Sequence, residues 1–479
     1  MSSGALMPRA RRAADDATAD VSSLLARIGS ADPVDFLVER IRPVVRRAVD
    51  PLQVAAWLEA DGMSDRAARV EYGYADVFAL AQEVYRRADP ASVEQPSPPA
   101  PVQHARDLGH GALYLLPTVI FPVVLASLGA TALLRGVLLV AWLSWAWSGT
   151  AAWLGYHLVG TGRPESAGRV LRWSTLAALL AGGILGSLTI GEGGPAVVLA
   201  VGLTAYQMSV TTLVFYRHER WIFAAMAPAA LGGVLCLTVL PGLVQPMVVV
   251  AMAAVALLLG LALHATTRTP AQPEPPLWPM MRLNLRRLVL VSGFTALTAA
   301  YFLYPQFYLL SGDVVIALGA LPVIAGMGIV EWQAHRFGDR AHALLFEVAR
   351  PDQFAIKARR LMFVGLGTCL SGVGLLAAVL LAALAVADRL SPPVLVLAGA
   401  SVLLAGAYFL AFLLANLGHQ AWLCGSLLGC LAAFAAAIGA VGDSASHAAE
   451  VFAVTTALLL TLTLAPACRQ IGQVWGHRR

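Results

Sequence analysis

The chain has 479 residues, of which 58% are hydrophobic and only 13% are charged, and its mean hydropathy is +0.71. A soluble domain could not remove this much apolar surface from water, so an ordinary soluble fold is excluded. The formal net charge of +5 does not indicate a nucleic-acid partner, because the basic residues fall mainly in the connections between apolar stretches.

Residues 1–106 are polar and rich in Arg and Asp, so they are interpreted as a cytoplasmic helical segment with a linker rather than as a cleaved leader. Apolar residues recur at helical spacing in its first part. Caps and turn residues predict three further short helices; these residues are Asp50, Pro51, Gly62, Ser64, Gly73 and Asp76.

Short helices with tight glycine turns are also typical of a helix-turn-helix. The stretch from Asp50 to Asp89, however, carries eight acidic residues against four Arg, a balance that would repel phosphate. We therefore expect no nucleic acid to bind, and interpret this segment as a module that docks on the membrane part or on a cytoplasmic partner.

Twelve apolar stretches follow, each close to the roughly 20 residues that a helix needs to cross about 30 Å of hydrocarbon. Only helices and closed barrels satisfy their backbone in a bilayer, so the predicted fold class is all-α, a polytopic membrane protein. The predicted spans are 113–134, 137–158, 170–190, 196–216, 221–240, 246–266, 287–310, 314–333, 361–386, 393–415, 420–440 and 449–468.

The distribution of charge predicts the orientation of these spans. Arg135 and Arg389 are the basic residues in the segments placed outside, whereas the connections on the other side are rich in Arg. Because Lys and Arg mark the cytoplasmic face, we expect a multi-pass protein of the cytoplasmic (inner) membrane with both termini inside.

The membrane part is predicted to be a duplicated six-helix unit. Tyr206 in the fourth span matches Tyr408 in the tenth, and Trp221 matches Trp422, at offsets of 202 and 201 residues. The predicted division is a first half at 107–268, a cytoplasmic linker at 269–286 and a second half at 287–479 with a cytoplasmic insertion at 334–360. A parallel repeat of this kind is typical of transporters.

Polar side chains inside spans are costly and therefore indicate function. Tyrosine rings can stack on sugars and amides can bond to hydroxyls, so these residues suit a glycan path around a shared central cavity. The alternatives are an interfacial aromatic belt for Tyr and helix–helix hydrogen bonds for Gln and Asn. The candidate path residues are Tyr206, Gln207, Tyr301, Tyr304, Gln306, Tyr408 and Asn416.

No catalytic, metal or cofactor site is expected. The five cysteines lie in or at the ends of spans without metal-ligand spacing, and are interpreted as small core residues. His335, Asp339 and His342 share one helix face and could hold a metal, but the alternating charge around them favours a solvated face. The sequence has no nucleotide-binding motif and no long external loop for the catalytic acids of a membrane glycosyltransferase, so we expect no enzyme.

The stretch after the eighth span, GIVEWQAHRFGDRAHALLFEVARPDQFAIKARRLMF (Gly328–Phe363), is acidic, aromatic and basic. It is predicted to be helical from Phe337 to Arg360, with an interruption near Pro351. Together with two six-helix halves and short external loops, it resembles the MOP flippase superfamily, and within it the Pel-type exopolysaccharide exporters.

This resemblance implies a flippase-like transporter that exports a polysaccharide or saccharide-lipid by alternating access. The implied partners are membrane lipid, a glycan or glycolipid substrate, and polysaccharide-synthesis proteins. Lipid-diphosphate flippases tend to carry basic residues inside the cavity, whereas these spans are nearly free of charge, with Arg135 and Glu331 at span ends. That difference favours a neutral glycan.

Two other functions stay open. A non-transporting scaffold of a cell-envelope polysaccharide complex would fit the N-terminal segment. A major-facilitator-type carrier also has two six-helix halves, and Arg336–Arg340 faintly resembles its loop motif. Its long cytoplasmic loop, however, normally joins the halves, whereas the long connection here follows the eighth span.

Overall fold

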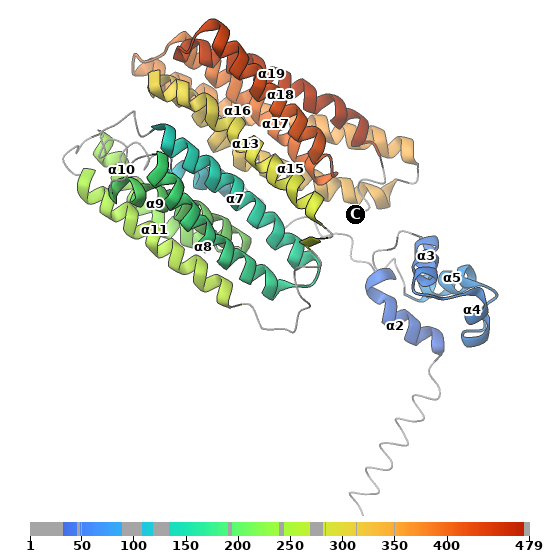
Figure 1. The fold of residues 1–479 in the computed structure, drawn as a ribbon. Coiled ribbons are helices and arrows are strands. Elements are labelled where there is room, and N and C mark those ends of the chain that lie inside the picture. Colours follow the sequence, from blue (N-terminus) through green and yellow to red (C-terminus); the bar gives the residue numbers. More distant parts are fainter. Residues whose placement is uncertain are drawn as a thin grey trace, which may run out of the picture. The chain divides into compact units, whose positions relative to one another are not determined.

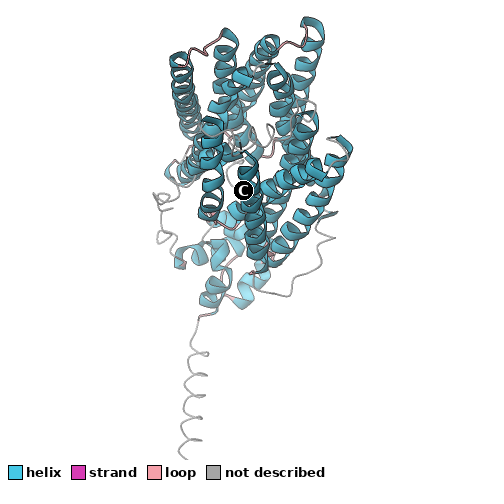
Figure 2. Ribbon diagram, turned by 90° about the vertical axis from the view of Figure 1, so that its left-hand side faces the viewer, coloured by secondary structure: helices cyan, strands magenta, loops and turns pink. Residues whose placement is uncertain are grey.

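The computed structural model describes residues 32–45, 48, 50–88, 108–117, 134–189, 194–238, 244–268, 281–282, 284–312, 314–348 and 350–473. Every regular element in these residues is a helix (Figure 2). The chain divides into two compact units, residues 1–98 and 99–479, and the division falls inside the linker predicted at 95–101, at the end of the N-terminal segment. The predicted all-α fold of a polytopic membrane protein is confirmed.

The N-terminal unit contains four short helices: α2 (Pro33–Val45), α3 (Pro51–Ala60), α4 (Asp65–Glu71) and α5 (Val77–Arg87). The side chains of Asp50, Ser64 and Asp76 accept hydrogen bonds from backbone N–H groups in the first turns of α3, α4 and α5, as the sequence predicts. One apolar core joins the helices, and its fully buried residues include Leu37, Ile41, Leu58, Leu80 and Val84.

The membrane unit consists of long apolar helices (Figure 1). In the first half these are α7 (Leu134–Gly160), α8 (Pro164–Thr189), α9 (Gly194–Phe215), α10 (Glu219–Thr238) and α11 (Val244–Thr267). In the second half they are α13 (Leu285–Gly312), α14 (Val314–Ala317), the 3-10 turn η4 (Leu318–Ala320), α15 (Leu321–Glu347), α16 (Pro351–Val386), α17 (Pro392–Asn416), α18 (Gln420–Val441) and α19 (Ala445–Gln470).

Among the described residues, ten helices are long and apolar enough to cross a membrane. They correspond to the predicted second to fourth and sixth to twelfth spans, and α10 corresponds to the fifth. Of the predicted first span, the structure describes 113–117 and residue 134, within a helical segment at 108–117 and the start of α7. The rest of that span and most of the predicted linker 269–286 lie outside the described residues.

Helix packing follows the same pattern in the two halves. In the first, α9 packs against α7, α8 and α11, and α10 packs against α11. In the second, α17 packs against α15, α16 and α19, and α18 packs against α19. Figure 1 shows α7 to α11 as one group of helices and α13 to α19 as another. A shared pattern of neighbours supports the duplication that was inferred from Tyr206 and Tyr408.

The turns that precede α10 and α18 are also equivalent. Arg217, with φ 60°, lies two residues after the end of α9, and Gly418, with φ 88°, lies two residues after the end of α17 and 201 residues later in the chain. In each turn the next residue is a histidine, His218 or His419, whose N–H donates to a carbonyl five residues before it. A left-handed residue that closes a helix in this way satisfies its terminal carbonyl groups.

The predicted insertion 334–360 is not a separate element in the structure. Helices α15 and α16 continue into it, and residues 348–350 lie between them; of these, 348 and 350 are described and are extended. Pro351 is the first residue of α16, so the interruption predicted near it is confirmed. The insertion is therefore formed by the ends of two long helices.

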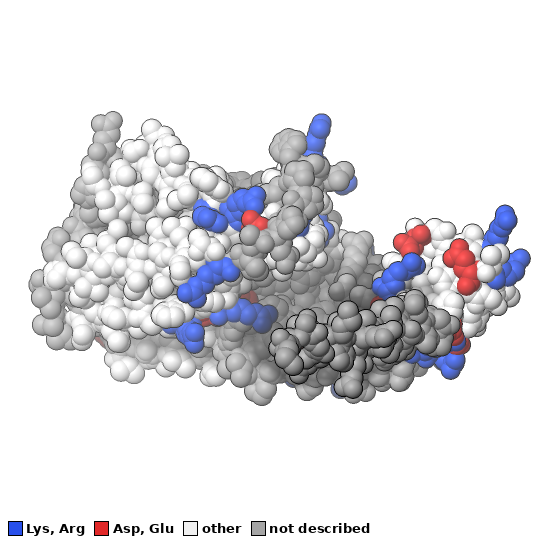
Figure 3. Space-filling model, turned by 90° about the horizontal axis from the view of Figure 1, so that it is seen from below, with Lys and Arg blue, Asp and Glu red and all other residues white. Residues whose placement is uncertain are grey.

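One end of the membrane unit carries most of its basic residues, and we call it the basic end. It comprises the turns that join α7 to α8, α9 to α10 and α15 to α16, with the start of α13 and the end of α19; its basic residues include Arg163, Arg217, Arg220, Arg286, Arg340, Arg359 and Arg469. In Figure 3, Lys and Arg side chains gather in one region of this unit, beside a wide area without charged side chains.

Candidate functional site

The two halves meet through two helix pairs. Helix α7, the second helix of the first half, packs along α13, the first helix of the second half. Segment 108–117, the first helix of the first half, contacts α15, which continues the second helix of the second half. In both pairs the first helix of one half meets the second helix of the other, as a duplicated architecture requires.

Neutral hydrogen bonds and a close approach at a glycine hold α7 against α13. The indole N–H of Trp142 donates to the carbonyl of Ala296 at 2.8 Å, and the Thr295 hydroxyl donates to the carbonyl of Ala146 at 3.2 Å. A Cβ atom at Gly149 would crowd the Thr295 side chain, so glycine there permits a close approach. Such contacts between small and hydroxyl residues are typical of packed membrane helices.

Cation–π contacts lie at both ends of the same helix pair. The Arg135 guanidinium lies 4.6 Å from the centre of the Phe307 ring, at the end opposite the basic end. At the basic end, the Arg287 guanidinium lies 5.6 Å from the Trp153 ring. The contact between α7 and α13 therefore extends over nearly the whole length of the helices.

The contact between segment 108–117 and α15 is charged. Nδ1 of His110 lies 2.6 Å from Oε2 of Glu331, and the Tyr114 hydroxyl donates to Oε1 of Glu331 at 2.7 Å. Nε2 of His110 lies 3.7 Å from Oε1 of Glu219, in the first turn of α10. We call these four residues the inter-half cluster. His110, Tyr114 and Glu219 belong to the first half, and Glu331 belongs to the second.

Backbone geometry explains how these side chains come together. His110 and Tyr114 are four residues apart, so they project from one face of the helical segment toward the same carboxylate. Between them, a Cβ atom at Gly111 would overlap the carbonyl oxygen of Ala325. Glycine at this position therefore lets the segment lie directly against the backbone of α15.

Charged groups in this place indicate function. The side chains of His110 and Glu219 are only 10% and 11% exposed, and Glu331 is 20% exposed. Removing charges from water costs more than their pairing usually returns, so largely buried charged groups are rare within membrane helices, and those present mark candidate functional sites.

Sequence reasoning did not find this site. It noted Glu331 only as a charge at a span end, and it assigned no role to His110, Tyr114 or Glu219. The available signal was the presence of ionisable residues of opposite charge at the edges of several spans. Their pairing could not be read from the chain, because His110 and Glu331 are 221 residues apart.

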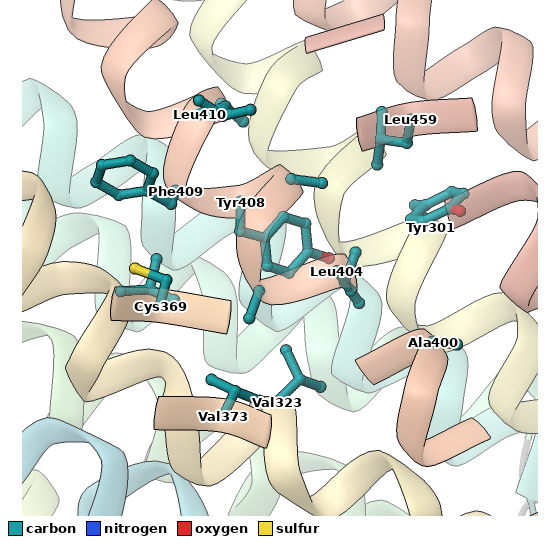
Figure 4. Close-up of a cluster of buried hydrophobic side chains, with 14 of the residues drawn as sticks. Tyr301, Val323, Cys369, Val373, Ala400, Leu404, Tyr408, Phe409, Leu410 and Leu459 are labelled. Carbon is teal, nitrogen blue, oxygen red and sulfur yellow. The ribbon is translucent and has the colours of Figure 1, made fainter. Parts of the chain in front are cut away.

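Two of the predicted path residues occupy equivalent positions. The Tyr206 hydroxyl on α9 donates to the carbonyl of Leu113 at 3.3 Å, and the Tyr408 hydroxyl on α17 donates to the carbonyl of Thr298 at 3.4 Å. Each tyrosine thus binds the first helix of its own half. Figure 4 shows Tyr408 among apolar side chains such as Leu404. Both tyrosines are buried, so in this conformation they lie in helix–helix contacts.

The other predicted path residues are spread along the spans. Tyr301 is fully buried and its hydroxyl bonds to those of Thr455 and Thr456, at 3.2 and 3.0 Å. The amide of half-buried Gln207 donates to the Ser148 hydroxyl at 3.3 Å, whereas Gln306 is buried in α13.

Asn416 is exposed at the end of α17, eight residues, or about 12 Å of helix, beyond Tyr408. Tyr408 and Asn416 therefore do not lie side by side on α17, and a shared cavity with Gln207 stays a prediction.

Two of the predicted path region's tyrosines form an accessible pair near the end of α13. Tyr304, which is 39% exposed, and the half-buried Tyr308 share a hydroxyl–hydroxyl bond of 3.1 Å, and their rings are nearly perpendicular. Both rings contact Phe434 on α18, and Phe307, beneath the Arg135 guanidinium, contacts Tyr308. We call Tyr304, Phe307, Tyr308 and Phe434 the aromatic cluster. It lies toward the end opposite the basic end.

Among the described residues, no group of three His, Cys, Asp or Glu side chains is placed to hold a metal ion. His335, Asp339 and His342 are exposed along α15. Cys369 and Cys430 are buried, and Cys424 and Cys468 are half-buried; all four are free thiols. The side chain of Cys236 is not among those that the structure describes.

Comparison with known proteins does not assign the chain to a family. No protein-family model matches it, and no curated protein is significantly similar to it in sequence. The geometry of the membrane unit is therefore the basis for a functional proposal, and the inter-half cluster and the aromatic cluster are the sites on which it can be tested.

Proposed function

We propose that the protein is a flippase-like transporter that exports a polysaccharide or saccharide-lipid by alternating access, as in the MOP superfamily and its Pel-type exporters. The observation that carries this proposal is the duplicated helix packing, in which two similar halves meet through two equivalent helix pairs. Two such halves can change their mutual angle while each core stays packed.

A saccharide substrate is supported by the aromatic cluster. Exposed Tyr304 and half-buried Tyr308 place two perpendicular rings and a pair of bonded hydroxyl groups together, which suits the apolar faces and hydroxyl groups of a sugar. Two residues of opposite charge, Asp443 and Arg135, lie close enough to act on Tyr308, and Arg135 is engaged with Phe307. A mainly neutral aromatic surface favours a neutral glycan over a diphosphate-linked one.

The Pel-type resemblance is supported by the stretch Gly328–Phe363. Helices α15 and α16 continue through it and place its charged residues at the basic end. In the same proposal the protein lies in the cytoplasmic (inner) membrane, the basic end and both termini are on its cytoplasmic side, and the protein has no catalytic role. Its partners are membrane lipid, the glycan and polysaccharide-synthesis proteins.

A scaffold function is the second candidate, and the N-terminal unit favours it. This unit has its own apolar core, yet the large apolar side chains of Phe36, Leu52, Val70 and Phe78 are exposed on it. Exposed apolar residues of this size are typical of surfaces that bind another protein. In a scaffold, the membrane unit would not need a substrate path.

Export of surface polysaccharide distinguishes the two functions. In cells that lack the protein, the double variant Tyr304→Ala/Tyr308→Ala should fail to restore export while it reaches the membrane at normal levels, because the stacking surface is lost. Trp173→Ala is the matched control, since Trp173 on α8 is 65% exposed and far from this cluster in the chain. Normal export by the double variant would exclude the aromatic cluster as part of the path and favour the scaffold.

A further inference from the structure

We propose that the exposed face of α16 at the basic end binds an anionic phospholipid, whose phosphate group is held by Lys357 and Arg360. This site goes beyond general contact with lipid, because it selects one class of headgroup. It does not depend on a substrate path, so it belongs equally to a transporter and to a scaffold.

Helix α16 has one buried and one exposed face. Its buried residues include Phe354, Ala358 and Met362, which recur every four residues, and the helix packs against α15 and α17. The exposed residues are also spaced by three or four, so they share one face. We call them the exposed stripe, which comprises Ile356, Lys357, Arg360, Phe363, Val364 and Gly367.

The length of α16 places the two cations at the depth of lipid headgroups. Val386, at the end of α16, is followed by charged Asp388 and Arg389, so the apolar part of the helix ends there. Arg360 lies 26 residues before Val386, or about 39 Å along the helix axis. The hydrocarbon core is only about 30 Å thick, so Arg360 and Lys357 lie beyond it, whereas Phe363 and Val364 border it.

Several basic residues of the basic end are already engaged within the protein. The guanidinium groups of Arg220, Arg287 and Arg336 lie over tryptophan rings. Lys357 and Arg360, in contrast, form no ion pair with the described residues. Asp352, the acidic residue nearest to them in the chain, precedes Lys357 by five positions and therefore projects from another side of the helix.

Comparison of the two halves shows the same difference at equivalent positions. Arg169 directly precedes the third predicted span and Arg360 directly precedes the ninth. Glu165, four residues before Arg169, accepts a hydrogen bond from its guanidinium at 2.8 Å. The residue four positions before Arg360 is Ile356, which is 67% exposed and cannot neutralise it. The second half thus has a free cation where the first half has an internal ion pair.

This arrangement suits a phosphate group with acyl chains attached. Lys357 and Arg360 are three residues apart, so their like charges repel each other, and an anion between them removes that repulsion. A guanidinium binds two phosphate oxygens at once, and a lysine adds a point charge. The acyl chains then lie along Phe363 and Val364. A zwitterionic headgroup brings its own cation, so an anionic lipid is favoured.

Thermal stability of the purified full-length protein in neutral detergent measures this binding. Added phosphatidylglycerol should raise the melting temperature in a saturable manner, because a ligand that binds the folded state stabilises it. Phosphatidylcholine should raise it much less, and inorganic phosphate should not raise it. Equal stabilisation by phosphatidylcholine would contradict an anionic site, and stabilisation by inorganic phosphate would assign the site to a free anion. Either result would overturn the proposal.

Variants that remove charge locate the site. For Lys357→Gln/Arg360→Gln, the affinity for phosphatidylglycerol should fall about fivefold per charge, or about thirtyfold in total. Arg340→Gln/Arg359→Gln is the matched control, since it removes the same charge from exposed positions at the same end. The Arg359 guanidinium lies beside Gly472, after α19, rather than on the exposed stripe. Undiminished affinity in the first variant, or an equal loss in the control, would overturn the proposal.

A further variant keeps both cations and does not depend on the folding of the double variant. Ile356→Glu gives Arg360 the partner that Glu165 gives Arg169, and a Glu four residues before an Arg supports a helix. It should abolish the stabilisation by phosphatidylglycerol, whereas Ile356→Gln, the uncharged control, should retain most of it. Normal stabilisation of Ile356→Glu, or equal losses in the two variants, would contradict the role of Arg360.

Discussion

Burial separates two kinds of polar side chain in the membrane unit. Tyr206 and Tyr408 are neutral and give their hydroxyl protons to backbone carbonyl groups, so their burial is compatible with permanent helix packing. His110 and Glu331 carry ionisable groups, and Nδ1 of His110 lies 2.6 Å from Oε2 of Glu331. The first pair forms contacts within each half, and the second forms a contact between the halves.

The N-terminal unit has a different charged centre. The Glu83 carboxylate accepts hydrogen bonds from Arg86 and Arg87, and these lower the pKa of Glu83 from 4.5 to about 2. Arg87 also bonds to Asp32, whose pKa is lowered mainly by the backbone N–H of Val34 and further by Arg87. These contacts join the N-terminal end of α2 to the last turn of α5.

We predict that acid destabilises this unit over a defined range. A carboxylate whose pKa is lower in the folded than in the unfolded state stabilises the fold above the unfolded pKa, and this stabilisation is lost as the pH falls through the folded pKa. For Glu83 the free energy of unfolding of residues 1–98 should therefore fall between pH 4.5 and about 2. Urea unfolding followed by circular dichroism at several pH values measures it.

The control for that experiment is Glu59→Gln, which changes an exposed carboxylate on α3. The free energy of unfolding of this variant should change with pH in the same way as that of unsubstituted residues 1–98. The Glu83→Gln variant should be less stable near neutral pH, and its free energy of unfolding should depend less on pH. Parallel profiles for Glu83→Gln and the parent would show that the Arg86 and Arg87 contacts do not stabilise the unit.

At the scale of whole elements, the two inter-half helix pairs are equivalent in position but different in chemistry. The pair of α7 and α13 is closely packed along its length by Gly149, Thr295 and aromatic rings. The pair of segment 108–117 and α15 combines a close approach at Gly111 with the charged inter-half cluster. The two pairs thus share an arrangement of helices but not the chemistry of their side chains.

We predict that Gly111→Ala forces segment 108–117 away from α15, because the new Cβ would overlap the Ala325 carbonyl oxygen. Overpacking of this kind typically costs about 1–3 kcal/mol, so the melting temperature of the protein in detergent should fall. Gly109→Ala is the matched control, since nothing lies within 4 Å of the corresponding Cβ position. Equal melting temperatures for the two variants would mean that the close approach contributes nothing to stability.

For the molecule as a whole, the concentration of Arg at one end predicts the orientation in the membrane. A single cysteine at Asp352, exposed at the basic end, should react with a membrane-impermeant maleimide only after the cells are permeabilised. A single cysteine at Asp443, exposed at the opposite end, should react in intact cells. Both variants require a background without the native cysteines. Labelling of Asp352→Cys in intact cells would reverse the orientation.

The sequence by itself determined the class of the protein and much of its local structure. Apolar length is a local property, so most spans were predicted within a few residues, as were the caps at Asp50, Ser64 and Asp76 and the helix break at Pro351. Each of these depends on neighbours within about one helical turn or on the hydrophobicity of one stretch.

Only the tertiary structure decided which polar residues meet. Tyr206, Tyr301 and Tyr408 were chosen as path residues because they are polar within spans, yet their hydroxyl groups bond within their own halves. His110 and Glu331 meet across the two halves from positions 221 residues apart. Such contacts depend on the rotation of each helix about its axis and on which helices become neighbours, and hydrophobic patterns of nearly uniform spans specify neither.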